Sequence, residues 1–257
     1  MKMPDLKTRT AAGLLMGVVI AGMLLSGCAT GGGGGSASGA KVVATKEQPF
    51  VNALGMKFVP VPGTKILMCT TETTVAQYQA AGMGYMAPKF AQGSTHPAVN
   101  VSQKDAKAWC AWLTKTEGRR YRLPTILEWG AAVGSGTYPW GKNWPPPNNF
   151  ENFCGQEFKT PEAIAFAKSL GAQAGEWRVI GGFQDRHVFT APVGSYPPNN
   201  LGINDLSGNV SEWCGDRAVL RGGSWLNLDR VNLQSSCLRG YAADSRNVYN
   251  GFRCVLE

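Results

Sequence analysis

A helical pattern of hydrophobic and polar positions is clearest in residues 102–117. Apolar side chains recur there every three or four residues, which places them on one face of a helix. They are Ala106, Trp109, Cys110 and Leu113. Ser102 and Asp105 have the spacing of a capping box at the start of this helix, and Gly118 is a suitable stop. We therefore predict an amphipathic helix that turns Cys110 toward the core.

Two shorter helices are predicted on either side of this one. One covers residues 74–82, and the other covers residues 124–133, with Pro124 at its first position and Leu123 just outside. Beyond Gly134 the pattern predicts turns and short strands. The chain contains 33 glycines and 15 prolines in 257 residues, and these interrupt regular structure throughout. The pattern therefore predicts a fold that is rich in loops.

The N-terminus has the order of an export signal. Basic residues precede an apolar run, residues 11–25, which is shorter than the ~20 residues of a membrane span. The run ends in Leu-Ser-Gly before Cys28, an ending that resembles the bacterial lipobox. We therefore expect a signal peptide over residues 1–27 and lipid, including palmitate, on Cys28, which anchors the protein to a membrane. An uncleaved transmembrane anchor is the alternative.

The residues after Cys28 indicate location and domain organisation. Ala29 follows the cysteine, and by resemblance to Gram-negative lipoproteins this favours the outer membrane. Residues 28–48 are rich in glycine and serine and predict a flexible tether. Residues 49–257 are long enough for one domain with a sizeable core.

The charge distribution of the chain does not indicate nucleic-acid binding. The formal net charge is +8, but part of it belongs to the leader, and the remaining basic residues are scattered. A nucleic-acid-binding surface gathers its basic residues on one face. We expect no nucleic-acid partner, and we expect a monomer.

Six cysteines remain after Cys28. They are Cys69, Cys110, Cys154, Cys214, Cys237 and Cys254. Their spacing contains no CxxC pair and the chain has two histidines, so a zinc site is not predicted. An even number of cysteines in an exported chain indicates disulfides, whose pairing the spacing leaves open.

Several segments occur in the order typical of one protein family. They include NALGMKFVPVPG at 52–63, ETTVAQYQA at 72–80, HPAVNVSQKDAKAWCAWL at 96–113, YRLPTILEWGAAV at 121–133, YPWG at 138–141, APVGSYPPNNLGINDLSGNVSEW at 191–213, RGGSW at 221–225 and GFRC at 251–254. Together they resemble the formylglycine-generating enzyme, or sulfatase-modifying factor, family. The resemblance implies an α+β fold: an irregular, loop-rich, C-type-lectin-like single domain.

The same resemblance bears on catalysis. In the oxidases of this family, two cysteines shortly after the GGS(W/Y) motif bind copper as thiolates, and soft thiolates suit Cu(I). Aligned from RGGSW, those positions fall on Asn227 and Asn232. We therefore expect no copper and no oxidase activity. A formylglycine-generating oxidase remains the alternative.

The resemblance also implies a structural metal and one disulfide. Residues 205–212 look like the calcium loop of the family, with Asp205, Gly208, Val210 and Glu212 as ligands. Calcium prefers such mixtures of carboxylate and carbonyl oxygen. The alternative is a tight turn in which these side chains only form hydrogen bonds. Cys110 and Cys254 match a disulfide of the family, whereas pairing Cys69 with Cys214 and Cys154 with Cys237 is a guess.

Residues 225–250 resemble the hypervariable tail of proteins that are diversified by retroelements, a lectin-fold branch of this family. Variation of the adenines in asparagine codons cannot produce Lys, Glu, Gln, Met or Trp. Residues 226–249 contain no Lys, Glu, Met or Trp, and their one Gln, Gln234, matches a fixed scaffold position of the branch. The branch keeps Arg239 as scaffold. We assign ligand contact to Trp225, Leu226, Asn227, Leu228, Val231, Cys237, Leu238, Gly240, Tyr241, Ala242, Ala243, Val248 and Tyr249.

These patterns together predict a surface-displayed lipoprotein that binds a ligand and does not catalyse a reaction. The ligand is expected to be a macromolecule, most simply a protein, because tyrosines in a changeable surface give large contact area at low entropic cost. Two alternatives remain beside the oxidase. Residues 225–250 form an ordinary lectin-like loop, or the protein is a structural lipoprotein of the envelope.

Overall fold

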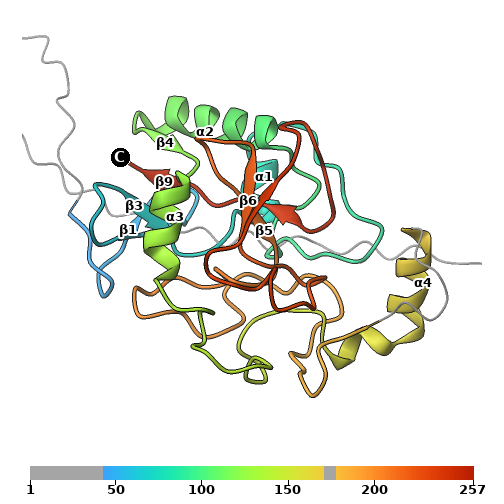
Figure 1. Ribbon diagram of the computed structural model, residues 1–257. Coiled ribbons are helices and arrows are strands. Elements are labelled where there is room, and N and C mark those ends of the chain that lie inside the picture. The colour runs from blue at the N-terminus through green and yellow to red at the C-terminus, as the bar shows by residue number, and fades with distance from the viewer. Residues whose placement is uncertain (1–42, 171–177) are drawn as a thin grey trace, which may run out of the picture. The chain divides into compact units, whose positions relative to one another are not determined.

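The computed structural model describes residues 43–170 and 178–257. The predicted signal peptide, Cys28 and the tether up to residue 42 lie outside the described residues. The part that is described mixes helix and sheet in an irregular, loop-rich arrangement that is not a closed barrel (Figure 1). No helix in these two ranges has the length and apolar character needed to cross a membrane.

The first sheet has the strand order β1-β2-β3-β9-β4, and every pair in it is antiparallel. Its strands are β1 (Phe50–Val51), β2 (Lys57–Pro60), β3 (Leu67–Cys69), β4 (Tyr121–Arg122) and β9 (Val255–Leu256). The C-terminal strand β9 is therefore inserted between β3 and β4, where it joins the two halves of this sheet.

The helices of the described residues are α1 (Val75–Gln79), α2 (Gln103–Glu117), α3 (Ile126–Val133), the 3-10 helix η1 (Gln156–Lys159) and α4 (Pro161–Ser169). Two of them, α2 and α3, cover the faces of the first sheet. Trp109 and Leu113 of α2 share one core with Phe58 of β2. Trp129 of α3 shares a second core with Val59, the next residue of the same strand. Because successive strand residues point to opposite faces, α2 and α3 lie on opposite sides of the sheet.

The longest predicted helix is confirmed. The Ser102 hydroxyl accepts from the N–H of Asp105, and the Asp105 carboxylate accepts from the N–H of Ser102. Gly118 ends the helix with a φ of 67°, in the left-handed region that favours glycine. Cys110 faces the core, as predicted.

Two predicted helix boundaries are wrong. The helix predicted over residues 74–82 ends at Gln79. The helix predicted over residues 124–133 begins at Ile126, so Pro124 precedes it instead of forming its first turn. The reason is that Thr125 and Glu128 form a complete capping box, each side chain accepting from the other's backbone N–H.

The helix α4 lies where turns and short strands were predicted. Thr160 caps it, and Pro161 occupies its first turn. Both residues are typical of helix starts, so this signal was present in the sequence. Ala163, Phe166 and Ala167 are the side chains that α4 buries.

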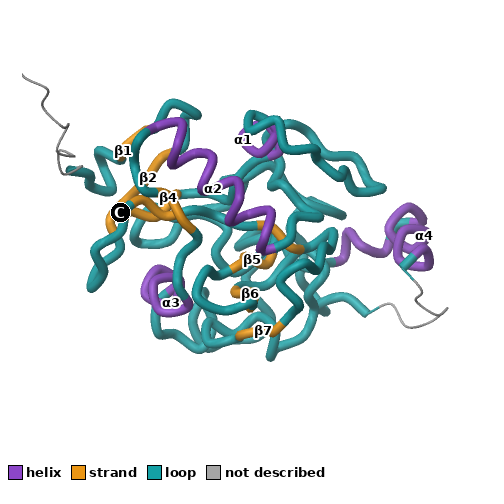
Figure 2. Tube along the Cα trace, turned by 90° about the horizontal axis from the view of Figure 1, so that it is seen from above, coloured by secondary structure: helices purple, strands orange, loops and turns teal. Residues whose placement is uncertain are grey.

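The second sheet has the order β7-β6-β5-β8. Its strands are β5 (Ser211–Trp213), β6 (Val219–Arg221), β7 (Leu238–Gly240) and β8 (Asn250–Gly251). The strand β8 is parallel to β5, and the other pairs are antiparallel. Figure 2 shows β5, β6 and β7 side by side, with β7 outermost.

The structure corrects the predicted disulfides, because all six described cysteines are free thiols. Cys110 and Cys254 lie in the same core and are not bonded to each other. Continuing the register of β3 and β9 places Cys69 opposite Cys254, and the Cys69 N–H donates to the Cys254 carbonyl at 3.0 Å. Cys69 therefore neighbours Cys254, which the guessed pairing with Cys214 did not foresee.

Candidate ligand-binding site

The segment after β6 begins with two glycines that the packing requires. Gly222 has a φ of +73°, and a Cβ atom there would lie 2.7 Å from the carbonyl oxygen of Leu206. That distance is too short for any side chain. The tight turn at this point directs Ser224 and Trp225 into the molecule, where both are buried.

Trp225 anchors the segment and does not contact solvent. Its side chain is 0% exposed and packs among four phenylalanine rings whose centroids lie 5.4 to 5.9 Å away. These rings are Phe90, Phe158, Phe166 and Phe189. The indole N–H donates to the Val248 carbonyl at 3.1 Å and so joins the two ends of the segment. The assignment of Trp225 to ligand contact is therefore wrong.

Other predicted contact residues also support the segment from inside. Leu226, Leu228, Val248 and Tyr249 are half-buried and pack against the aromatic cluster around Trp225. Tyr241 is half-buried too, and its ring lies 6.4 Å from that of Trp213. Such side chains fix the shape of the segment and offer only part of their surface to a partner.

The remaining predicted positions reach the surface. Val231 is 66% exposed and Leu238 is 47% exposed, and Gly240 and Ala242 are exposed as well. We call these four residues the outer positions. Cys237 and Ala243 are half-buried beside them. The structure thus divides the predicted contact residues into an inner group that packs and an outer group that a partner can touch.

Asn227 and Asn232 are half-buried, and both contact one guanidinium. The Arg239 guanidinium is 3.5 Å from the Asn227 side-chain oxygen and 3.5 Å from the Asn232 carbonyl. It also donates to the Gly222 carbonyl at 2.6 Å and to the Ser211 hydroxyl. The Ser224 hydroxyl donates to the Asn227 oxygen at 3.0 Å. Asn227 and Asn232 therefore act as uncharged hydrogen-bonding groups around the guanidinium of Arg239.

Glu212, the last residue of the predicted calcium loop, forms a buried ion pair with Arg253. Glu212 accepts from the Arg253 guanidinium through both carboxylate oxygens, at 2.6 to 2.9 Å, and from the Trp129 indole N–H at 2.8 Å. Asp205 lies nearby and accepts from the N–H of Gly194 at 2.6 Å. The Asp205 carboxyl also shares a hydrogen bond with the buried carboxyl of Glu72.

Burial raises the pKa of carboxyls around this ion pair. The pKa of Asp205 rises to about 6 because the side chain is fully buried. The pKa of Glu72 is raised well above its usual range by burial and by the charge of Asp205. The pKa of Glu151 rises to about 8 by burial and by the same charge. Arg253 thus faces several carboxyls, and burial raises the pKa of Asp205, Glu72 and Glu151, which it does not bind.

The model of the sulfatase-modifying factor enzyme 1-like domain matches residues 39–257. The chain belongs to this family. A formylglycine-generating enzyme of Streptomyces coelicolor is 31% identical over 194 residues, covering 63% of this chain and 53% of that protein. The inactive C-alpha-formylglycine-generating enzyme 2 of mouse is 34% identical over 176 residues, covering 62% of this chain and 48% of that protein. The chain thus spans about half the length of these relatives.

A solved structure has the same fold. PvdO from Pseudomonas aeruginosa superimposes with a TM-score of 0.56 at 22% identity, covering 75% of this chain and 80% of that one. The relatives named above include a formylglycine-generating enzyme and a protein described as inactive. Membership alone does not decide whether this chain catalyses a reaction.

The residues at the copper positions do not fit copper. Cu(I) prefers thiolate sulfur, and Asn227 and Asn232 offer amide groups instead. The Cys237 sulfur lies 4.0 Å from the Asn232 side-chain oxygen, and the Arg239 guanidinium already stands between the two asparagines. A second cation there would be repelled without thiolates to compensate.

The residues of the calcium loop do not fit calcium either. Both oxygens of Glu212 bind Arg253, which leaves that carboxylate without a free lone pair directed at a metal. Within the described ranges, no group of three or more His, Cys, Asp or Glu side chains is arranged to hold a metal. Asp205, Gly208 and Val210 keep their places in a tight turn, with Asp205 at a φ of 59°. The ion pair with Arg253 was not foreseen from the sequence.

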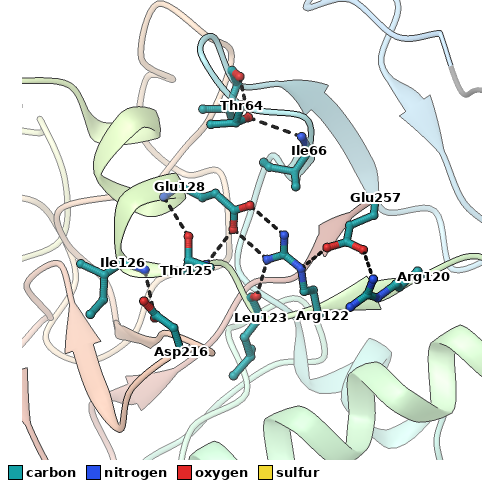
Figure 3. Close-up of polar contacts among 11 residues, drawn as sticks. Thr64, Ile66, Arg120, Arg122, Leu123, Thr125, Ile126, Glu128, Asp216 and Glu257 are labelled. Carbon is teal, nitrogen blue, oxygen red and sulfur yellow. Dashed lines mark hydrogen bonds and ion pairs between the residues drawn. The ribbon is translucent and has the colours of Figure 1, made fainter.

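A separate cavity of about 540 Å³ lies between α2 and β4. Cys110, Ala111 and Leu123 are among its lining residues, and no predicted contact residue borders it. Figure 3 shows the neighbouring polar network, in which Arg122 reaches Glu128 at 2.7 Å and Glu257 at 2.5 Å. This network ties β4 to α3 and to the C-terminus, and so stabilises the wall of the cavity.

Proposed function

We propose that this chain is a lipid-anchored surface protein that binds a macromolecular ligand, a protein, through residues 225–250 and does not act as an oxidase. One observation carries the proposal: Arg239 stands between Asn227 and Asn232, where the oxidases of the family have copper ligands. The network of amides and guanidinium has no group that could bind Cu(I) or activate oxygen.

An oxidase assay tests the loss of catalysis. The purified protein is incubated with Cu(I) and a peptide that contains a sulfatase motif, and conversion of its cysteine to formylglycine is measured by mass spectrometry. We expect no conversion and no stoichiometric copper. The double variant Asn227→Cys/Asn232→Cys should gain Cu(I) binding, whereas Asn227→Ser/Asn232→Ser should not. Conversion by the wild-type protein would show that it is an enzyme.

The exposure of the outer positions supports a binding role. Val231, Leu238, Gly240 and Ala242 are exposed beside a rigid, buried anchor, Trp225. A fixed frame that carries changeable side chains is the arrangement of an antibody paratope. Sequencing the same locus from several isolates tests this role. We expect substitutions to concentrate at the outer positions, while identical sequences would favour a structural envelope lipoprotein.

The anchor is proposed on the sequence of residues 1–28. Metabolic labelling with radioactive palmitate should mark the wild-type protein and leave Cys28→Ser unlabelled. Cell fractionation should place the labelled protein in the outer membrane. Labelling of Cys28→Ser to the wild-type level would exclude the proposed lipidation site.

A further inference from the structure

The strand β7 is an open edge of the second sheet. The sheet order ends at β7, which pairs with β6 and with no other described strand. The edge of a sheet exposes backbone N–H and C=O groups that can bind an added strand. Two of the outer positions, Leu238 and Gly240, belong to β7. The edge and the candidate contact surface therefore coincide.

The hydrogen-bond register shows which backbone groups of β7 face outward. Tyr241 donates its N–H to the Ala218 carbonyl at 3.1 Å, and Arg239 is paired with Leu220. Backbone groups in an antiparallel ladder alternate between the two sides of a strand. Arg239 and Tyr241 therefore direct their backbone groups toward β6. The N–H and C=O groups of Leu238 and Gly240 point the other way, to the open edge.

The side chains on this edge leave room for a neighbouring strand. A Cβ atom at Gly240 would meet nothing within 4 Å, and Leu238 is 47% exposed. The side chain of Arg239 points inward, where it binds the Gly222 carbonyl at 2.6 Å. An incoming strand would thus meet one apolar side chain, Leu238, and an open position at Gly240, while the Arg239 guanidinium is held on the inner side.

From this geometry we propose that the protein partner binds by adding an extended segment to β7 as a further strand. This inference rests on the proposed binding role of residues 225–250 and names its mode. The outward N–H and C=O groups of β7 have the spacing that an added strand can match with its own backbone. In strand addition, hydrogen bonds between the backbones provide the affinity, and side-chain contacts provide the specificity. That division suits a surface whose side chains change, because the backbone contribution stays constant when the outer positions vary.

Amide exchange and a matched pair of variants test the mode. The probe is a short synthetic peptide selected on the purified protein from a random displayed library, and exchange is followed by two-dimensional NMR. In the free protein, the amides of Leu238 and Gly240 should exchange rapidly and those of Arg239 and Tyr241 slowly. Binding of the peptide should slow the exchange of Leu238 and Gly240.

Gly240→Pro removes an outward N–H that β6 does not use, and Gly240→Ala keeps it. We expect Gly240→Pro to weaken peptide binding by about tenfold and Gly240→Ala to change it less than about twofold. If Val231→Asp weakens binding while Gly240→Pro does not, and exchange at Leu238 and Gly240 is unchanged, strand addition is wrong although the segment binds. Selection of no peptide would also overturn strand addition, and the proposed binding role would then be judged by the locus sequences.

Discussion

Arg253 and Glu212 form a bidentate ion pair in which both side chains are fully buried. The pair connects the residue before Cys254 to β5, and thereby the C-terminus to the second sheet. The Trp129 indole N–H and the Asn204 carbonyl occupy further hydrogen-bonding positions of the pair. A buried charge that loses its partner is strongly unfavourable, so this pair should be the most sensitive polar contact of the domain.

The first prediction concerns this pair. Replacing Glu212 by Gln leaves the Arg253 charge buried without its hydrogen-bonded counter-ion, and we expect a loss of about 3–5 kcal/mol in the free energy of unfolding. Urea denaturation followed by tryptophan fluorescence measures the change. The control is Lys104→Ala, which breaks the exposed contact of Lys104 with Asp244 and should cost less than about 1 kcal/mol. Equal effects of the two substitutions would contradict the buried role of Glu212.

The second prediction separates anchoring from binding within residues 225–250. Trp225→Ala should destabilise the protein by about 3–5 kcal/mol, because it removes a fully buried ring from the aromatic cluster. Leu238→Ala should change the unfolding free energy by less than about 0.5 kcal/mol, because the side chain is half exposed on an edge strand. Thermal unfolding of both variants measures the difference. A stable Trp225→Ala protein would mean that Trp225 is not the anchor.

Local signals made parts of the fold predictable. Ser102, Asp105 and Gly118 define α2 because capping is settled by neighbours in the chain. The alignment from RGGSW also needs no three-dimensional information, but its prediction that Asn227 and Asn232 replace copper ligands stays a prediction. The family and the fold class followed in the same way, from motifs in a fixed order.

Long-range contacts were not predictable from local patterns. Glu212 matched a calcium ligand in its own loop, yet its partner Arg253 comes from the far end of the chain. Trp225 stood inside the candidate contact segment, and only the surrounding phenylalanines show that it is buried. Cys69 was paired by guesswork because the register of β3 with β9 cannot be read from spacing. In each case, the deciding neighbour lies far away in sequence.

The third prediction concerns metal removal. Since Glu212 is engaged by Arg253, chelation with EDTA should leave the unfolding temperature unchanged within about 1 °C, and added calcium should not raise it. Differential scanning calorimetry measures both. The comparison is with Asp205→Asn, which keeps an acceptor for the Gly194 N–H. An increase in the unfolding temperature with calcium that Asp205→Asn abolishes would restore the predicted metal site.

The last prediction is a fall in stability as the pH rises from about 5 to about 8. Burial, and then the charge of Asp205, raise the pKa of Glu151 to about 8 in the folded protein from the ordinary value of 4.5. The folded state therefore holds a proton that the unfolded state releases above pH 4.5. Its contribution is fully present below that pH and is lost as the pH rises through about 8. Asp185, with a pKa raised to about 7 by burial, acts in the same direction.

Glu151→Gln removes this titration and keeps an oxygen that can accept from the Ser207 N–H. The variant should therefore lose less unfolding free energy between pH 5 and pH 8 than the wild type does, with the remaining slope due to groups such as Asp185. Urea denaturation at several pH values gives the two slopes. Glu162→Gln, a change at an exposed position of α4, should leave the wild-type slope intact. If Glu151→Gln kept the full slope, Glu151 would have to be ionised in the folded protein. In that case Arg253 would lower the pKa of Glu151 by more than burial raises it.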